Sequence, residues 1–95
     1  MIRHVVLFKL KEEHKHEIPE MIKQGLAMKE GIPELVDFQM GEDFIHSARS
    51  CDIVLIATVK DKADLEIYAN HPLHLPLKKH LAEIAEQVVS GDFEF

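Results

Sequence analysis

Three side chains of this sequence, His4, Tyr68 and His74, could together move a proton. A histidine is the natural general base for removing a proton next to a carbonyl group at neutral pH. A phenol such as Tyr68 can donate a hydrogen bond to the oxyanion that then develops. Each residue also has a structural interpretation: a satisfied core histidine for His4, an amphipathic packing residue for Tyr68, and a rigid corner for His74. The residue types leave both interpretations open.

His74 lies between two prolines, Pro72 and Pro76. Such a segment is stiff and poorly suited to regular helix, so it would hold either a base or a corner in one conformation. His71 and His74, with a further histidine, suggest a metal site. However, Pro72 breaks the helical spacing that would bring the two rings together, and no cysteine or carboxylate completes a recognised ligand pattern. We therefore expect no metal.

Other features of the sequence narrow the function class. No Walker loop, Rossmann glycine pattern, nucleophile elbow or zinc finger occurs, so no cofactor is expected. The net charge of −6 argues against nucleic acid and against an anionic membrane surface, because both require clustered Lys and Arg. Cys51 is the only cysteine, and no signal peptide or membrane-spanning stretch is evident, so we expect a cytoplasmic protein.

Hydrophobic periodicity predicts the elements that must position these residues. We expect strands at Ile2–Leu10, Leu35–Glu42, Asp52–Lys60 and Val88–Phe95, a helix from about Lys15–Pro19 to Glu30, a second helix between Asp61 and Pro72, and a third opened by Pro76. Asp61 is a good N-cap for the second helix. Gly31 is expected to end the first helix in the left-handed conformation, and Pro33 forbids its continuation.

This order of elements predicts one α+β domain over residues 1–95, with ferredoxin-like topology. The four-stranded antiparallel sheet would carry its helices on one face. Its other face is also apolar, and nothing in the chain is left to cover it. A second copy of the sheet is the simplest cover, so we expect a homodimer, formed through the sheet faces, that closes into an α/β barrel.

Several segments resemble the stress-responsive dimeric A/B barrel (Dabb) family: Ile2–Lys9, Gly31–Pro33, Asp52–Leu55, Tyr68–His74 and Asp92–Phe93. The most specific is the pattern Tyr-x-x-His-Pro-x-His at 68–74, combined with a histidine near the N-terminus. One plant member of the family cyclises a linear polyketide without a cofactor. Its motif matches here at His4, Tyr68, His71 and His74, which implies Tyr68 and His74 as the catalytic pair. A further pocket histidine of that enzyme falls on Asp52, a departure that argues against carrying over its substrate recognition.

The predicted site is a cavity between the helices and the sheet. Its expected polar residues are His4, His71, Tyr68, His74 and Asp52, and its expected apolar walls are Val6, Phe8, Phe38 and Val54. Asp92 is interpreted as an edge-strand charge that discourages aggregation.

Several functions stay open for such a protein. The first is binding of a small apolar or aromatic molecule, with a variant in which His74 and Tyr68 catalyse a cofactor-independent, cyclase-like lyase reaction. The second is a non-catalytic, stress-associated structural dimer. The third, a haem-handling barrel of the monooxygenase type, rests on fold analogy alone.

Overall fold

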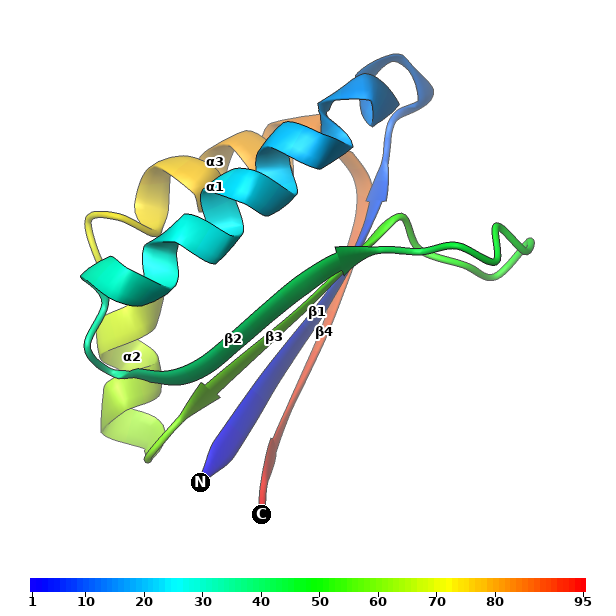
Figure 1. Cartoon of the computed structure of the whole chain (residues 1–95). Coiled ribbons are helices and arrows are strands. Elements are labelled where there is room, and N and C mark those ends of the chain that lie inside the picture. The colour runs from blue at the N-terminus through cyan, green and yellow to red at the C-terminus, as the bar shows by residue number, and fades with distance from the viewer.

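A computed structural model describes residues 1–95 and shows four strands and three α-helices (Figure 1). The elements are β1 (Ile2–Leu10), the 3₁₀ helix η1 (Glu12–Glu17), α1 (Ile18–Gly31), β2 (Leu35–Glu42), β3 (Ile53–Val59), α2 (Lys62–Ala69), α3 (Leu75–Ile84) and β4 (Ala85–Glu94). The strands form one antiparallel sheet in the order β2-β3-β1-β4. The predicted ferredoxin-like α+β fold is confirmed.

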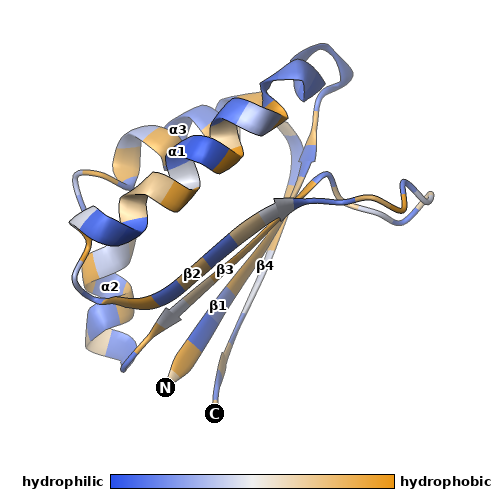
Figure 2. Ribbon diagram, in the orientation of Figure 1, coloured by the Kyte–Doolittle hydropathy of each residue, from blue (hydrophilic) through white to orange (hydrophobic).

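The three helices lie on one side of the sheet, with α1 and α3 next to each other and α2 at one end (Figure 1). No helix is both long enough and apolar enough to cross a membrane. Figure 2 shows that η1 is mainly polar, whereas apolar and polar residues alternate along the strands and helices. This alternation lets each strand present one set of side chains to the helices and another to the opposite face.

Local chemistry explains most of the boundaries. The Asp61 carboxylate accepts a hydrogen bond from the backbone N–H of Asp64 at 2.9 Å, so the predicted N-cap is confirmed. The left-handed conformation expected for Gly31 is wrong, because no glycine has a positive φ. Gly31 instead makes room, since a Cβ at this position would collide with the side chain of Leu73. The last strand begins at Ala85 rather than Val88, because α3 passes into β4 without an intervening loop.

The two faces of the sheet follow from register. Even-numbered residues of β1, such as Val6 and Phe8, are buried in the core beneath the helices. Leu7, on the opposite face, pairs with Val54 of β3 and with Val89 of β4. We call this opposite side the open face; its apolar residues on the three paired strands are Val5, Leu7, Val54, Ile56, Val89 and Phe93.

Candidate functional site

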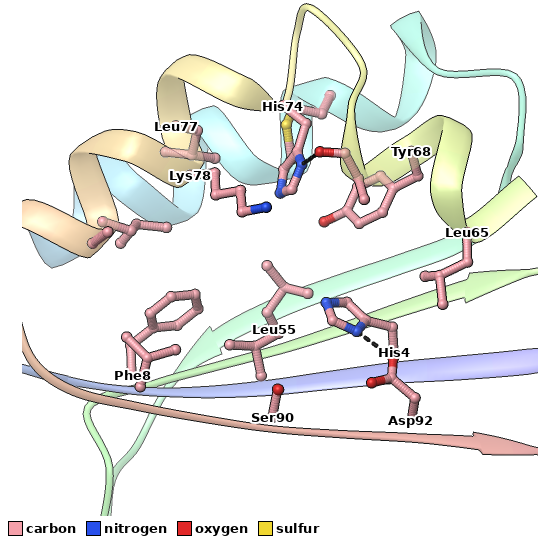
Figure 3. A pocket seen from close by; sticks show the side chains of 16 residues that line it. His4, Phe8, Leu55, Leu65, Tyr68, His74, Leu77, Lys78, Ser90 and Asp92 are labelled. Atoms are coloured by element: carbon pink, nitrogen blue, oxygen red, sulfur yellow. Dashed lines mark hydrogen bonds and ion pairs between the residues drawn. The ribbon is translucent and has the colours of Figure 1, made fainter.

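A cavity of about 480 Å³ lies between the helices and the sheet (Figure 3). Its sixteen lining residues come from six of the helices and strands and from the segment before α3, and eleven are hydrophobic. They are His4, Val6, Phe8, Met28, Leu55, Leu65, Tyr68, Ala69, His74, Leu77, Lys78, Leu81, Ala82, Val88, Ser90 and Asp92. Mostly apolar walls with a few polar groups, at this volume, are typical of small-molecule sites, which span about 300–1,000 Å³.

The structure brings His4, Tyr68 and His74 together from three different elements. His4 lies in β1, Tyr68 in the last turn of α2, and His74 is the N-cap residue of α3. The ring centroids of Tyr68 and His74 are 4.4 Å apart in a stacked arrangement, and those of His4 and Tyr68 are 6.2 Å apart. The stiff segment after α2 therefore returns His74 over the phenol ring.

The hydrogen bonding of His74 determines which of its nitrogens is free. Nδ1 lies 3.1 Å from the carbonyl oxygen of Ala69. A carbonyl can only accept, so Nδ1 carries the proton, and Nε2 of the neutral ring keeps its lone pair. Burial lowers the pKa of His74, and the charges of Lys78, His4 and His71 lower it further, against the opposing effect of the Ala69 hydrogen bond. At neutral pH the ring is therefore uncharged, and Nε2 is available as a base.

Tyr68 holds a donor without a partner. Its side chain is 1% exposed, and its hydroxyl makes no hydrogen bond in the protein. Burial raises the pKa of Tyr68, so the hydroxyl stays protonated. In Figure 3 the hydroxyl points into the cavity. A buried polar group without a partner costs about 1–3 kcal/mol, so a ligand that supplied an acceptor here would recover that energy.

His4 is hydrogen-bonded to Asp92, a residue that was expected only as an edge-strand charge. Its Nδ1 lies 2.5 Å from a carboxylate oxygen of Asp92, its neighbour in the pairing of β1 with β4. The carboxylate accepts, so Nδ1–H of His4 donates, and Nε2 is left for a ligand. Asp92 lines the cavity, so it is more than the edge-strand charge that was expected. The antiparallel pairing of the first and last strands was the signal that could have revealed this contact.

Lys78 and Ser90 line the cavity as well, and neither was predicted. Lys78 follows His74 by four residues, a spacing that places two side chains on the same face of a helix. That spacing was the signal that could have identified it.

Two predicted wall residues, Val6 and Phe8, line the cavity, whereas four other predicted residues do not. Phe38 packs against Tyr68 with ring centroids 6.4 Å apart, outside the cavity. Val54 lies on the open face, because it pairs with Leu7.

The other two residues outside the cavity have local hydrogen bonds instead. A carboxylate oxygen of Asp52 accepts from the backbone N–H of Leu10 at 2.8 Å. The Nδ1 atom of His71 accepts from the backbone N–H of Leu73 at 3.1 Å. The expectation that Phe38, Val54, Asp52 and His71 line the cavity is therefore corrected.

A second histidine–carboxylate cluster lies outside the cavity. The two carboxylate oxygens of Glu17 accept hydrogen bonds from Nε2 of His80 at 2.6 Å and from Nδ1 of His14 at 2.7 Å. These bonds lower the pKa of Glu17, with that of His80 contributing most. The cluster ties η1 to α3, and no group of three such side chains in the protein is placed to hold a metal ion.

Fold and cavity together define a small α+β protein with a ferredoxin-like sheet and a pocket beneath its helices. The chain belongs to the stress responsive A/B barrel domain (Dabb) family, whose model matches residues 2–95. No curated protein matches it in sequence.

Solved structures with the same fold include two dimeric proteins of unknown function. A protein from Bacteroides fragilis is 27% identical, with a TM-score of 0.88 over 99% of this chain and 95% of the other. A protein from Thermobifida fusca is 23% identical, with a TM-score of 0.89 over 99% and 90% of the two chains. A hydroxynitrile lyase from Passiflora edulis is 20% identical, with a TM-score of 0.83 over 97% and 90%.

Proposed function

We propose that this protein is a homodimer in which each chain binds one small, largely apolar or aromatic molecule that carries a hydrogen-bond acceptor. The observation that carries the proposal is the buried hydroxyl of Tyr68, which has no partner in the protein and faces a cavity of about 480 Å³. A fold that only needed an aromatic ring at this position would bury phenylalanine at lower cost. The hydroxyl therefore serves a group that comes from outside the chain.

The remaining walls indicate what kind of molecule fits. Phe8, Leu55, Leu77 and Leu81 offer apolar surface, whose burial favours binding by roughly 25 cal/mol per Å². The polar groups are gathered around His4, Tyr68 and His74, so they fix the orientation of the ligand rather than supply most of its affinity.

Dimerisation is supported by the open face and by the relatives. Val5, Leu7, Val54 and Ile56 form a continuous apolar surface that no element of the chain covers. The 27%-identical relative from Bacteroides fragilis is dimeric. A two-fold pairing of sheets would bury this surface in each copy.

A second candidate function is cofactor-independent proton transfer, which the free Nε2 of neutral His74 favours. In this reaction Nε2 takes a proton from the carbon next to a carbonyl, and the electrons of the C–H bond move onto the carbonyl oxygen. The hydroxyl of Tyr68 donates a hydrogen bond to the resulting enolate. In an aldol-type step the enolate carbon then attacks a second carbonyl group of the substrate, and the protonated His74 gives its proton to the alkoxide that results.

Binding and catalysis can be tested separately with an aromatic ketone such as 4-phenyl-2-butanone. Amide shifts of the labelled protein should change at the cavity residues, and Tyr68→Phe should weaken binding about tenfold, as expected for a lost hydrogen bond of roughly 1.5 kcal/mol. If the wild-type protein shows no change at the cavity with this ketone or with related aromatic carbonyl compounds, the binding proposal fails.

For catalysis, the protein should exchange the protons next to the ketone for deuterium in D₂O. His74→Ala should slow this exchange by about 10²–10⁴-fold, the usual contribution of a general base. His16→Ala is the matched control, since His16 is exposed and does not line the cavity. Binding without exchange would leave a ligand-binding protein and remove the enzymatic candidate.

A further inference from the structure

Lys78 is the one lysine or arginine among the sixteen residues that line the cavity. Figure 3 shows its ammonium group directed into the cavity, between His74 and the strands. The next residue, Lys79, is exposed and does not line the cavity. Lys78 is exposed as well, so the two lysines differ in that only Lys78 lines the cavity.

No carboxylate of the protein pairs with Lys78. The ion pairs of the structure engage Lys15, Lys60 and Lys62, but not Lys78. Asp92 is the only carboxylate that lines the cavity, and its Oδ1 atom is engaged with Nδ1 of His4. Among the residues that line the cavity, Lys78 is therefore a cation without an anionic partner in the protein. An anion brought by a ligand would meet this ammonium group beside largely apolar walls and could form a charge-assisted hydrogen bond with it.

We propose that the ligand of this cavity is a small oxo acid: an apolar body with a carbonyl group and an ionised carboxylate. The carboxylate binds the ammonium of Lys78, and the carbonyl oxygen accepts from the hydroxyl of Tyr68. The spacing of His74 and Lys78 supports a short link between the reacting carbon and the carboxylate of the ligand, because residues four apart on a helix have Cβ atoms about 5–6 Å apart. The carboxylate on Lys78 and the carbon that faces His74 are then only a few bonds from each other.

This inference rests on the proposed function and assigns its ligand class. It makes Lys78 an anion-binding residue that determines specificity, with no part in the proton transfer. Removal of its charge should therefore weaken the binding of acids and leave uncharged analogues unaffected.

The test uses 4-phenyl-2-oxobutanoate and its methyl ester, titrated into the wild-type protein, Lys78→Met and Lys79→Met. The wild-type protein should bind the acid at least about tenfold more tightly than the ester, because a hydrogen bond to a charged group contributes about 1.5–3 kcal/mol. This preference should disappear in Lys78→Met and persist in Lys79→Met. Methionine retains most of the length of the lysine side chain, and a thermal melt checks that each variant is folded.

The possible failures are distinguishable. Equal binding of acid and ester by the wild-type protein, or an acid preference that survives Lys78→Met, would overturn the oxo-acid assignment and leave the proposed function intact. If neither compound shifts the amide resonances of the cavity residues, the oxo-acid assignment and the proposed function fall together.

Discussion

The two faces of the sheet are made by the same strands but differ in chemistry. Under the helices, β4 contributes Asp92 and Ser90, and these meet His4, Tyr68 and His74 around a cavity. The open face presents Val5, Leu7, Val54 and Ile56 in its centre, with Arg3 and Lys9 at the two ends of β1.

The difference arises from how far the helices extend over the sheet. They bury the residues of β3 that face them, such as Leu55 and Ala57, but they leave β4 exposed along nearly its whole length. Space therefore remains above β4, and polar residues can lie there without the cost of full burial. The open face is apolar at its centre and no helix covers it, which is the arrangement from which we propose that it is an interface. Substitutions on the two sides of the sheet test this division.

The largest effect is expected for Val54→Asp on the open face. If this face is the dimer interface, the substitution buries an unpaired carboxylate, with an effective penalty of several kcal/mol. Sedimentation velocity should show a dimer for the wild-type protein and a monomer or unfolded chain for the variant. Ile67→Asp is the control, because Ile67 is 47% exposed on α2 and should leave the dimer unchanged. A wild-type protein that sediments as a stable monomer would contradict the proposed role of the open face.

Tyr68→Phe should give the next largest effect, and in the opposite direction. Because it removes a buried hydroxyl without a partner, we expect the free energy of unfolding to rise by about 1 kcal/mol in the absence of ligand, while ligand binding weakens. Tyr68→Leu removes the aromatic ring together with the hydroxyl. Because it also loses the stacking on His74, this variant should have a lower free energy of unfolding. A clear loss of stability in Tyr68→Phe, measured by urea unfolding, would mean that the hydroxyl has a structural partner.

The sequence predicted the bounds of the strands better than it predicted which strand residues line the cavity. The bounds of β1 and β2 were predicted correctly, β1 from a run that is apolar on both faces and β2 from the alternation of a half-buried strand. Val54 was assigned to the wrong face because β3 is apolar on both sides, so its pattern alone does not identify the side that meets the helices.

The residues of the site were predictable where a local sequence motif brings them together. They were not predictable where the pairing of two distant strands does so. The segment at 68–74 places Tyr68 and His74 close together by its own stiffness. Asp92 is 88 residues from His4, and only the register of β1 against β4 makes them neighbours. The conformation at the end of α1 was misjudged for a similar reason, because the neighbour of Gly31 is the side chain of Leu73, which comes from a distant segment.

A smaller effect is expected from His74 when the pH is lowered. Its folded-state pKa lies below its ordinary value of 6.5, so the unfolded chain binds a proton first as the pH falls. Stability is therefore full above about pH 6.5 and declines below it, as far as the lower folded-state pKa. Urea unfolding between pH 7.5 and pH 5 should show this decline reduced in His74→Gln and retained in His16→Gln. An unchanged slope in His74→Gln would mean that the ring is readily protonated in the folded protein and is not held as a neutral base.

The smallest effect is expected for Glu17→Gln, which alters a histidine–carboxylate contact that lies outside the cavity. The pKa of Glu17 is lowered first by the hydrogen bond from His80 and then by that from His14. Its contribution to stability is therefore present above its ordinary value of 4.5 and is lost as the pH falls through the lower folded-state value. The contribution is small, because exposed ion pairs are well solvated and screened by salt. The variant should melt slightly below the wild-type protein at pH 7, with the difference closing at acid pH, and should bind cavity ligands unchanged.

Asp92→Asn alters the other histidine–carboxylate contact, in which Asp92 holds Nδ1 of His4 at the edge of the cavity, so it should weaken ligand binding. If the two variants change ligand affinity equally, the contact between histidine and carboxylate does not depend on the cavity beside it, and the distinction between the two clusters fails.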